Sequence, residues 1–438
     1  MSFFLSGVHV PHRKHTAKAE AVRMTPPQTV TIPMSMHIGA PARPIVKGGD
    51  LVKVGTLIAE DVGAVSSPIY SSVSGRVTKI TEILLSNGST CPAVMIESDG
   101  KMEPDPNLCP PAIQSAEDVI EAIRKSGVVG LGGAGFPTHV KFRVDPARVE
   151  QLVINGAECE PYITSDTLTM TDRTDDMAAA LHAIKNILGI RSFVIGIERN
   201  KKRAIITMKM LARRVGGMEV KVLPDVYPQG GEKVLVYHTV KKVIPAGKLP
   251  IDVGCIVCNC TTLAAIGSYL RTGMPLVEKC VTVDGACLKE PKNVIVPIGT
   301  SISDVFDFCG GLKSTPEKIL YGGPMMGITV PDMSAPILKN TNAVLALSAK
   351  EARLPKTTSC IRCGACTNTC PFGLAPAAIA EAYRKKDVAL LEKLQVQSCM
   401  ECGCCSFTCP ANRPLVQTNK LSKAFIKEEK AKEAKKNG

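Results

Sequence analysis

The 438-residue sequence contains no tryptophan and only 4% aromatic residues, so aliphatic side chains must build its hydrophobic cores. It has no uninterrupted apolar run near the ~20 residues of a membrane span, which predicts a soluble or peripheral protein. The first residues lack the basic segment and small-residue cleavage site of a secretory signal, so we expect a reducing compartment. Basic stretches are not interleaved with stacking aromatics, which argues against nucleic-acid binding.

What the chain does have is cysteine, 18 residues in all, and eight of them form two copies of the spacing C-x2-C-x2-C-x3-C-P. This spacing is typical of a pair of [4Fe–4S] clusters, in which the fourth cysteine of each run binds the other cluster. The two predicted ligand sets are Cys360, Cys363, Cys366 and Cys409 for the first cluster, and Cys399, Cys402, Cys405 and Cys370 for the second. A zinc ribbon would leave the third and fourth cysteines without a role, so we interpret the motif as an electron carrier.

The formal charge of +13 is partly offset by the clusters, because four thiolates give each oxidised cluster about two net negative charges. Residues 420–438 contribute seven lysines and three glutamates. We expect this tail to be a solvated, fraying helix end, with contact to anionic lipid or an acidic partner as the functional alternative.

The pattern of strands, helices and turns predicts a multidomain α/β and α+β protein. The expected units are a β-rich domain (1–112), an α/β domain (113–270), a small α+β module (271–350), the cluster domain (351–414) and a basic tail (415–438). Within the first unit, the short β-branched runs of residues 46–80 resemble the barrel-sandwich hybrid of lipoyl and biotinyl domains. Those domains expose a modifiable lysine at a hairpin tip, where this chain has Ile69, Tyr70 and Ser71, so a swinging-arm carrier is disfavoured.

Local signals predict the elements of the later units. A serine cap, early acidic residues and a closing glycine predict a helix over residues 116–125, followed by short apolar strands alternating with helices around a parallel sheet. In the third unit we expect turns at 284–285 and 291–293 and a helix beginning near Ser303. The segment between the cysteine runs is long enough for two short helices.

Residues 130–135 match the pattern G-x-G-x-x-G, but they follow a predicted helix and lead into Phe136-Pro137. A dinucleotide-binding fingerprint should instead follow a strand and open a helix. Two interpretations remain, a backbone cradle for a phosphate group and a tight structural turn.

Several motifs together resemble a known family. The segments GLGGAGFPT with a following lysine, INGAECEP and YPQGGEK are similar to the flavin-site motifs of the NADH-oxidising subunit of respiratory complex I. With GVHVPHRK, YGGPMMG and both cysteine runs in order, the whole chain most resembles the C subunits of Rnf complexes, membrane-bound NADH:ferredoxin oxidoreductases. The third unit resembles that family's ligand-binding β-grasp (SLBB-like) module.

The resemblance implies an FMN site and an NADH site. Glu158 and Glu160 would be the catalytic carboxylates, facing the flavin and nicotinamide rings together with Asn155. The implied cofactor-binding residues are Gly130, Gly132, Gly133, Ala134, Gly135, Phe136, Lys141, Gly231, Glu232 and Asn259. The chain departs from complex I at Ala157, Lys233 and Cys258, which leaves individual nucleotide contacts open.

The implied function is electron input to a complex on the cytoplasmic face of a bacterial membrane, with NADH as substrate and membrane-embedded and peripheral subunits as partners. NADH would pass hydride to FMN, and single electrons would then cross the two clusters toward ion-translocating subunits. The alternatives are a cobalamin (corrin) reductase of a bacterial microcompartment and a non-catalytic electron-relay adaptor.

Two further groups are predicted to be structural. Cys255, Cys258 and Cys260 are expected to be buried thiols in an apolar strand. His9, His12 and His15 flank Pro11, which argues against a helix that would align them on a metal, so we expect a packed turn.

Overall fold

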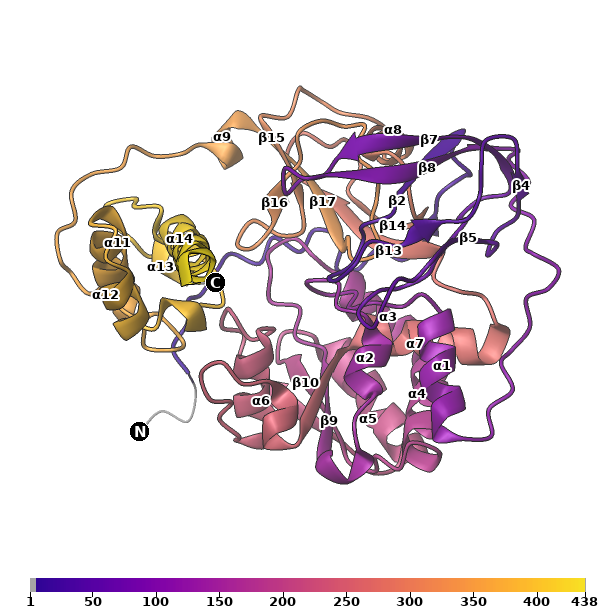
Figure 1. Ribbon diagram of the computed structural model, residues 1–438, viewed down its shortest axis with the longest axis horizontal. Coiled ribbons are helices and arrows are strands. Elements are labelled where there is room, and N and C mark those ends of the chain that lie inside the picture. The colour runs from indigo at the N-terminus through magenta and orange to yellow at the C-terminus, as the bar shows by residue number, and fades with distance from the viewer. Residues whose placement is uncertain (1–4, 438) are drawn as a thin grey trace.

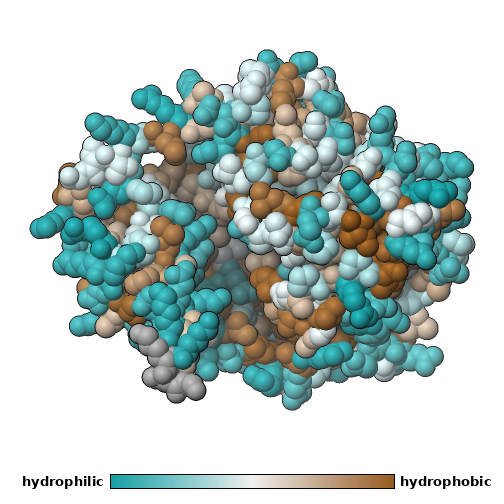
Figure 2. Space-filling view, turned by 45° about the horizontal axis from the view of Figure 1, so that its top comes forward, coloured by the Kyte–Doolittle hydropathy of each residue, from teal (hydrophilic) through white to brown (hydrophobic). Residues whose placement is uncertain are grey.

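The computed structural model describes residues 5–437, which form a larger body and a smaller lobe (Figure 1). The lobe holds the cysteine-rich helices near the C-terminus, and a linker that follows α9 (Ala349–Ala352) runs along its outer edge. In space-filling view a hollow separates lobe and body (Figure 2). Among the helices of the described residues, none has the length and apolar character to cross a membrane.

The N-terminal unit is built from two small antiparallel sheets that enclose aliphatic side chains such as Ile32 and Ile58, both fully buried. One sheet has the order β2 (Thr29–Pro33), β8 (Thr90–Ser98), β7 (Gly75–Leu84), β4 (Leu51–Val52), and the other β3 (Arg43–Pro44), β5 (Leu57–Glu60), β6 (Ile69–Tyr70).

Residues 69–71, which correspond to the exposed hairpin tip of lipoyl and biotinyl domains, do not form an exposed tip here. Ile69 and Ser71 are buried, and the Tyr70 hydroxyl donates a hydrogen bond to the carbonyl of Lys125. This segment is therefore an internal surface against the next unit, which explains the small serines that surround it.

The second unit is a parallel sheet in the order β11-β10-β9-β12. Its strands are β9 (Gln151–Asn155), β10 (Phe193–Glu198), β11 (Met218–Leu223) and β12 (Cys255–Asn259). Helices α1 (Ala116–Lys125), α4 (Thr174–Asn186), α5 (Lys202–Val215) and α7 (Cys260–Thr272) share the core on one face, and α6 (Glu232–Val240) covers the other. The helix predicted over 116–125 is confirmed, with Ser115 and Asp118 forming a capping box.

The strand order of this sheet reverses once. The chain adds β10 and β11 on one side of β9 and then returns to place β12 on the other side. In open parallel sheets, ligands bind outside the carboxyl ends of the strands at such a switch point. Asn155 and Asn259 end the two strands there and are register partners.

The third unit is a mixed sheet in the order β1-β14-β13-β17-β15-β16. Its strands are β1 (Ala21–Arg23), β13 (Glu278–Asp284), β14 (Lys292–Pro297), β15 (Lys318–Tyr321), β16 (Ile328–Thr329) and β17 (Ala343–Leu347). The N-terminal strand β1 pairs with β14, so the first and third parts of the chain share a sheet. The predicted turn at 291–293 was too long, because Lys292 and Asn293 already belong to β14. The predicted helix is α8 (Ile302–Phe308), which Ser301 caps.

The lobe contains a short helix within each cysteine run, α10 (Ala365–Asn368) and α13 (Cys404–Phe407), each ending before the fourth cysteine. Between the runs lie α11 (Pro376–Arg384) and α12 (Val388–Lys393), the two short helices that the sequence predicted. The last helix, α14 (Leu415–Asn437), corrects the expectation of a solvated tail. Its first half buries Asn419, Ser422 and Ile426 against the lobe, and five of the seven lysines of residues 420–438 follow Ile426.

A buried lysine joins three units. The Lys339 ammonium is 1% exposed and donates hydrogen bonds to the Ser67 hydroxyl at 3.1 Å, the Pro68 carbonyl at 2.7 Å and the Gly127 carbonyl at 2.8 Å. Three oxygen acceptors satisfy the three ammonium protons, which compensates for the burial of a charge without a carboxylate.

We predict that Lys339→Met destabilises the protein, because two buried carbonyls lose their donor at roughly 1–3 kcal/mol each. Thermal unfolding followed by dye fluorescence should show a lower midpoint for this variant. Lys350→Met, at an exposed lysine in α9, serves as the matched control and should unfold like the unmodified chain. Equal midpoints for all three proteins would show that Lys339 does not join the units.

Candidate functional site

The glycine-rich segment forms a closed loop at the edge of the parallel sheet. Val129 and Pro137 pair as an isolated bridge, and the Gly130 amide donates to the Phe136 carbonyl at 2.9 Å. Between these ties, residues 132–134 are exposed, and Gly135 has a left-handed φ of +72° that suits glycine. The loop therefore presents bare backbone to its surroundings.

This loop lies over the switch point. A Cβ on Gly132 would collide with the Asn259 side chain, 2.8 Å from its Cγ, whereas a Cβ on Gly133 would meet nothing within 4 Å. Asn259 caps α7 by accepting from the Thr261 and Thr262 amides, and its own amide donates to Asp166 at 2.7 Å. Loop, strand end and helix start are thus packed as one unit.

A cation stands beside the loop. The Lys141 ammonium, from α2 (Thr138–Phe142), donates to the Val257 carbonyl at 3.1 Å and lies 3.4 Å from the Glu232 carboxylate. Glu232 is the first residue of α6, and Gly231 precedes it as the cap. The Asn155 amide donates to the Gly230 carbonyl at 2.9 Å. The structure therefore brings the flavin-loop lysine, the Gly-Glu segment and both strand-end asparagines together.

The candidate carboxylate Glu158 is engaged inside the protein. It is 5% exposed, and its two oxygens accept from the Asp166 amide and the Thr167 hydroxyl, both at 2.7 Å, at the start of α3 (Ser165–Asp172). Burial raises the pKa of this carboxyl, and the nearby Lys14 ammonium opposes the shift. These contacts turn the Glu158 carboxylate toward α3, whereas the sequence analysis expects it to face the flavin and nicotinamide rings.

Two lysines hold the backbone of that loop. The Lys14 ammonium donates to the carbonyls of Glu158 at 2.9 Å and Glu160 at 2.8 Å, and also to that of Ile163. The buried Lys201 donates to the Glu158 carbonyl at 3.1 Å and pairs with the buried Glu198. Burial lowers the pKa of Lys14. Sequence reasoning missed both lysines, although Lys14 lies in the quoted segment GVHVPHRK.

Glu160 joins the loop to two other segments. Its carboxylate accepts from the Met326 amide at 2.8 Å and the Met325 amide at 3.1 Å, and it lies 3.4 Å from the Tyr227 hydroxyl. Burial raises its pKa to about 7, against the opposing effect of the two methionine amides. The Tyr227 hydroxyl also donates to the Cys402 carbonyl at 2.7 Å. A continuous set of contacts therefore runs from the loop of residues 158–160, which we call the carboxylate loop, to a predicted cluster ligand.

A cavity in the lobe is lined by Cys370, Cys399, Cys402 and Cys405, the four cysteines predicted to hold the second cluster. The Asn419 amide and the Glu401 backbone amide each lie 3.4 Å from the Cys399 sulfur and donate toward it. Within residues 5–437, no three His, Cys, Asp or Glu side chains converge closely enough for a single metal ion. The four cysteines predicted for the second cluster, Cys370 from the first run among them, therefore line one common cavity.

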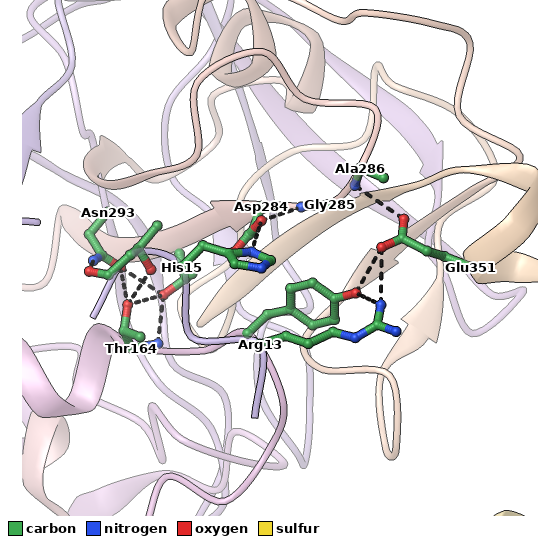
Figure 3. A network of polar contacts seen from close by, with 11 residues as sticks. Arg13, His15, Thr164, Asp284, Gly285, Ala286, Asn293 and Glu351 are labelled. Atoms are coloured by element: carbon green, nitrogen blue, oxygen red, sulfur yellow. Dashed lines mark hydrogen bonds and ion pairs between the residues drawn. The ribbon is translucent and has the colours of Figure 1, made fainter. Parts of the chain in front are cut away.

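Residues 12–15, which we call the N-terminal strap, contact segments of the second and third units (Figure 3). The Arg13 guanidinium donates to the Tyr162 hydroxyl at 2.6 Å and pairs with Glu351 of α9, the helix that precedes the linker to the lobe. His15 contacts Asp284 at 3.0 Å. The Tyr162 amide donates to the His12 carbonyl at 2.9 Å. The chain turns at residues 15–18 and packs on the neighbouring units, as the sequence predicted.

The three central cysteines, Cys255, Cys258 and Cys260, are all buried as predicted, although Cys260 begins α7 instead of ending a strand. Burial raises the pKa of each thiol, that of Cys258 to about 12. Neutral buried thiols are packing groups.

The open glycine backbone, the neighbouring Lys141 and the position at the switch point suit a flat, anionic ligand such as FMN. Four family models match the chain. They are the RnfC barrel sandwich hybrid domain (residues 2–101), the Nuo51 FMN-binding domain (123–268), the SLBB domain (280–329) and the 4Fe-4S dicluster domain (356–413). A flavin domain and a dicluster domain in one chain define a flavin- and iron–sulfur-dependent oxidoreductase subunit.

Curated relatives identify the family. The C subunit of the proton-translocating ferredoxin:NAD(+) oxidoreductase complex of Clostridium ljungdahlii is 40% identical over 86% of this chain and 83% of its own. The C subunit of the Na(+)-translocating complex of Acetobacterium woodii is 39% identical, covering 86% of both chains. The chain belongs to the family of C subunits of ion-translocating ferredoxin:NAD(+) oxidoreductase complexes. The corrin reductase and the relay adaptor are not favoured.

One solved structure shows the same fold over much of the chain. A chain of the NAD+-reducing [NiFe]-hydrogenase in the H2-reduced state superimposes with a TM-score of 0.50 and 16% identity. The match covers 72% of this chain and 61% of that one.

A matched pair of variants tests the loop. We predict that Gly132→Ala lowers both the thermal midpoint of the apoprotein and its FMN affinity, because the new Cβ displaces the Asn259 cap. Gly133→Ala enters open space, so it should keep the midpoint but weaken FMN binding about ten-fold, roughly 1.4 kcal/mol, by blocking close approach. Quenching of FMN fluorescence measures the affinity. Unchanged affinity in Gly133→Ala would argue that flavin binds elsewhere.

Proposed function

We propose that this chain is the NADH-oxidising electron-input subunit of a membrane-associated, ion-translocating complex. The observation that carries the proposal is the set of contacts from Glu160 through Tyr227 to Cys402, which joins a flavin-type domain directly to a cluster cavity. Operating in reverse, the same path would reduce NAD(+), the acceptor in the names of the relatives.

We assign FMN to the loop of residues 130–135, whose residues 132–134 are exposed, with Lys141 beside its anionic groups. Phe136 is half-buried next to this loop and offers an aromatic face for a nicotinamide or adenine ring. Gly231 and Glu232 begin α6 on the same side as Lys141, where they would contact the nucleotide. Asn155 and Asn259 are assigned to shaping the floor of the site.

When bound, the flavin accepts a hydride and releases single electrons, and the cluster pair carries them one at a time. The residues of the chain hold the loops of the flavin and cluster sites in position. Lys14 and Lys201 fix the carbonyls of the carboxylate loop, and Glu158 anchors that loop to α3. Glu160 holds the Met325–Met326 backbone against Tyr227, which keeps the Cys402 loop in contact with the flavin domain.

We assign Cys399, Cys402, Cys405 and Cys370 to the cluster nearer the flavin. The other cluster is assigned to Cys360, Cys363, Cys366 and Cys409. The expected partners are membrane-embedded and peripheral subunits of the same complex, and the expected location is the cytoplasmic face of a bacterial membrane, reached through those partners. The names of the relatives, which are subunits of ion-translocating complexes, support this assignment.

An anaerobic absorbance titration with NADH tests the function on the chain reconstituted with iron, sulfide and FMN. We expect stoichiometric NADH to bleach both the flavin and the cluster bands. Bleaching by dithionite alone, with no response to NADH, would contradict the proposal that this chain oxidises NADH.

A cysteine pair tests the ligand assignment. Cys399→Ala should lose about half of the bound iron, because one of two equal clusters loses a thiolate. Cys404→Ala removes a neighbouring buried cysteine outside the predicted set, so this variant should keep all of the bound iron. Iron analysis and electron paramagnetic resonance of the dithionite-reduced protein give the two readouts. Full iron retention in Cys399→Ala would overturn the assignment.

A further inference from the structure

The two cysteine runs of the lobe fold alike but have different surroundings. At corresponding positions, Arg362 and Glu401 both adopt left-handed φ values of +56° and +63°, as do Gly364 and Gly403 at +74° and +82°. A four-residue helix carries the third cysteine of each run, α10 in the first and α13 in the second. The surroundings of one copy can therefore be compared with those of the other, residue by residue.

The second copy is packed against the flavin domain. Met400 touches Gly231, where an added Cβ would lie 3.2 Å from its sulfur, and a Cβ on Gly403 would lie 2.9 Å from the Met325 carbonyl. Cys404 is 1% exposed and its thiol lies 3.8 Å from the Tyr227 carbonyl. This face of the second copy is the internal contact between lobe and body.

The same face of the first copy is uncovered. Ile361, which corresponds to Met400, is 68% exposed, and a Cβ on Gly364 would meet nothing within 4 Å. All residues from 353 to 364 are exposed, including Leu354 at 83%. Exposed aliphatic side chains on one exposed segment beside a cluster loop favour a contact surface when polar and charged residues surround them.

The loop of the fourth cysteine completes this surface. The Thr358 amide donates to the Ala411 carbonyl at 3.0 Å, and the Thr357 hydroxyl donates to the Asn412 carbonyl at 3.0 Å. Phe407, half exposed, lies at the start of that loop. We call residues 353–364 with 407–413 the outer face.

Apart from the cluster thiolates, the charged side chains of the outer face have one sign. The face contains Arg353, Lys356, Arg362 and Arg413, and no aspartate or glutamate. None of these four cations takes part in an ion pair within the described residues. In the second copy, by contrast, the residue corresponding to Arg362 is Glu401, which pairs with Lys423 at 2.6 Å. Unpaired cations around exposed apolar side chains favour a partner whose surface carries carboxylates.

We propose that the outer face docks an acidic protein that carries single electrons. In that complex Ile361 contacts the partner in the way that Met400 contacts the flavin domain. The inference rests on the proposed function, since it makes the first cluster the exit of the path. Each NADH gives up two electrons and one proton, so each docked partner centre is reduced by one electron, and two such transfers complete the turnover.

The test uses the full holo-chain and membranes that carry the other subunits of the complex but lack this chain. Co-sedimentation at increasing salt measures binding of the unmodified protein and of a variant with Arg353→Glu, Lys356→Glu and Arg362→Glu. We expect about a ten-fold loss of affinity and a weaker salt dependence for this variant. Ile361→Glu should also lower affinity, while NADH still bleaches both clusters in each isolated variant.

The matched control reverses three exposed cations of α5 that have no ion pair among the described residues, Lys202→Glu, Lys209→Glu and Arg213→Glu, and should bind membranes normally. Equal binding by both triple variants would overturn the proposal. Retention on protein-free vesicles of anionic lipid, lost in the outer-face variant, would also overturn it in favour of a lipid surface. Failure of NADH to bleach the unmodified holo-chain would instead reject the proposed function. This absorbance measurement is independent of the co-sedimentation that tests docking.

Discussion

The hydrogen bond from the Tyr227 hydroxyl to the Cys402 carbonyl joins the two functional halves of this protein. Electron transfer through a chain of cofactors requires that the protein hold their binding loops at constant separation, and the lobe is attached to the body by a linker that could not do this alone. The Glu160 carboxylate accepts from the same hydroxyl and from the Met325 and Met326 amides. Gly403 of the cluster loop packs against the Met325 carbonyl. Three segments far apart in the sequence therefore meet at one tyrosine.

Two lysine ammonium groups fix the backbone of the carboxylate loop. Lys14 and Lys201 direct their ammonium groups at main-chain carbonyls of the loop, and Glu198 compensates Lys201. Burying such groups is costly, so they are retained only where hydrogen bonds satisfy them. Lys14 belongs to the N-terminal strap, which also contacts the third unit through His15 and α9 through Arg13 (Figure 3). The strap thus stabilises the geometry of the site although it lies far from the cysteines in sequence.

The two cluster-binding turns of the lobe share a backbone conformation but differ in their surroundings. One buries Met400 against the body and the other exposes Ile361 to solvent. A relay needs two faces, one toward the donor and one toward the acceptor. The change from the paired Glu401 to the unpaired Arg362 at the same position shows how one backbone can serve two surfaces of different charge.

The sequence alone determined the cysteine motif and its crossed ligand rule, the helix of residues 116–125, the alternation of strands and helices, and the family, because these depend on local spacing and periodicity. It did not reveal that Glu158 is turned inward to α3, that Ile69 and Ser71 are buried, or that α14 packs its first half on the lobe. It also gave no sign that β1 joins the sheet of the third unit. Those features arise from contacts between residues separated by tens to hundreds of positions. Only the tertiary structure decides such contacts, since burial and hydrogen-bond partners are properties of the packed chain.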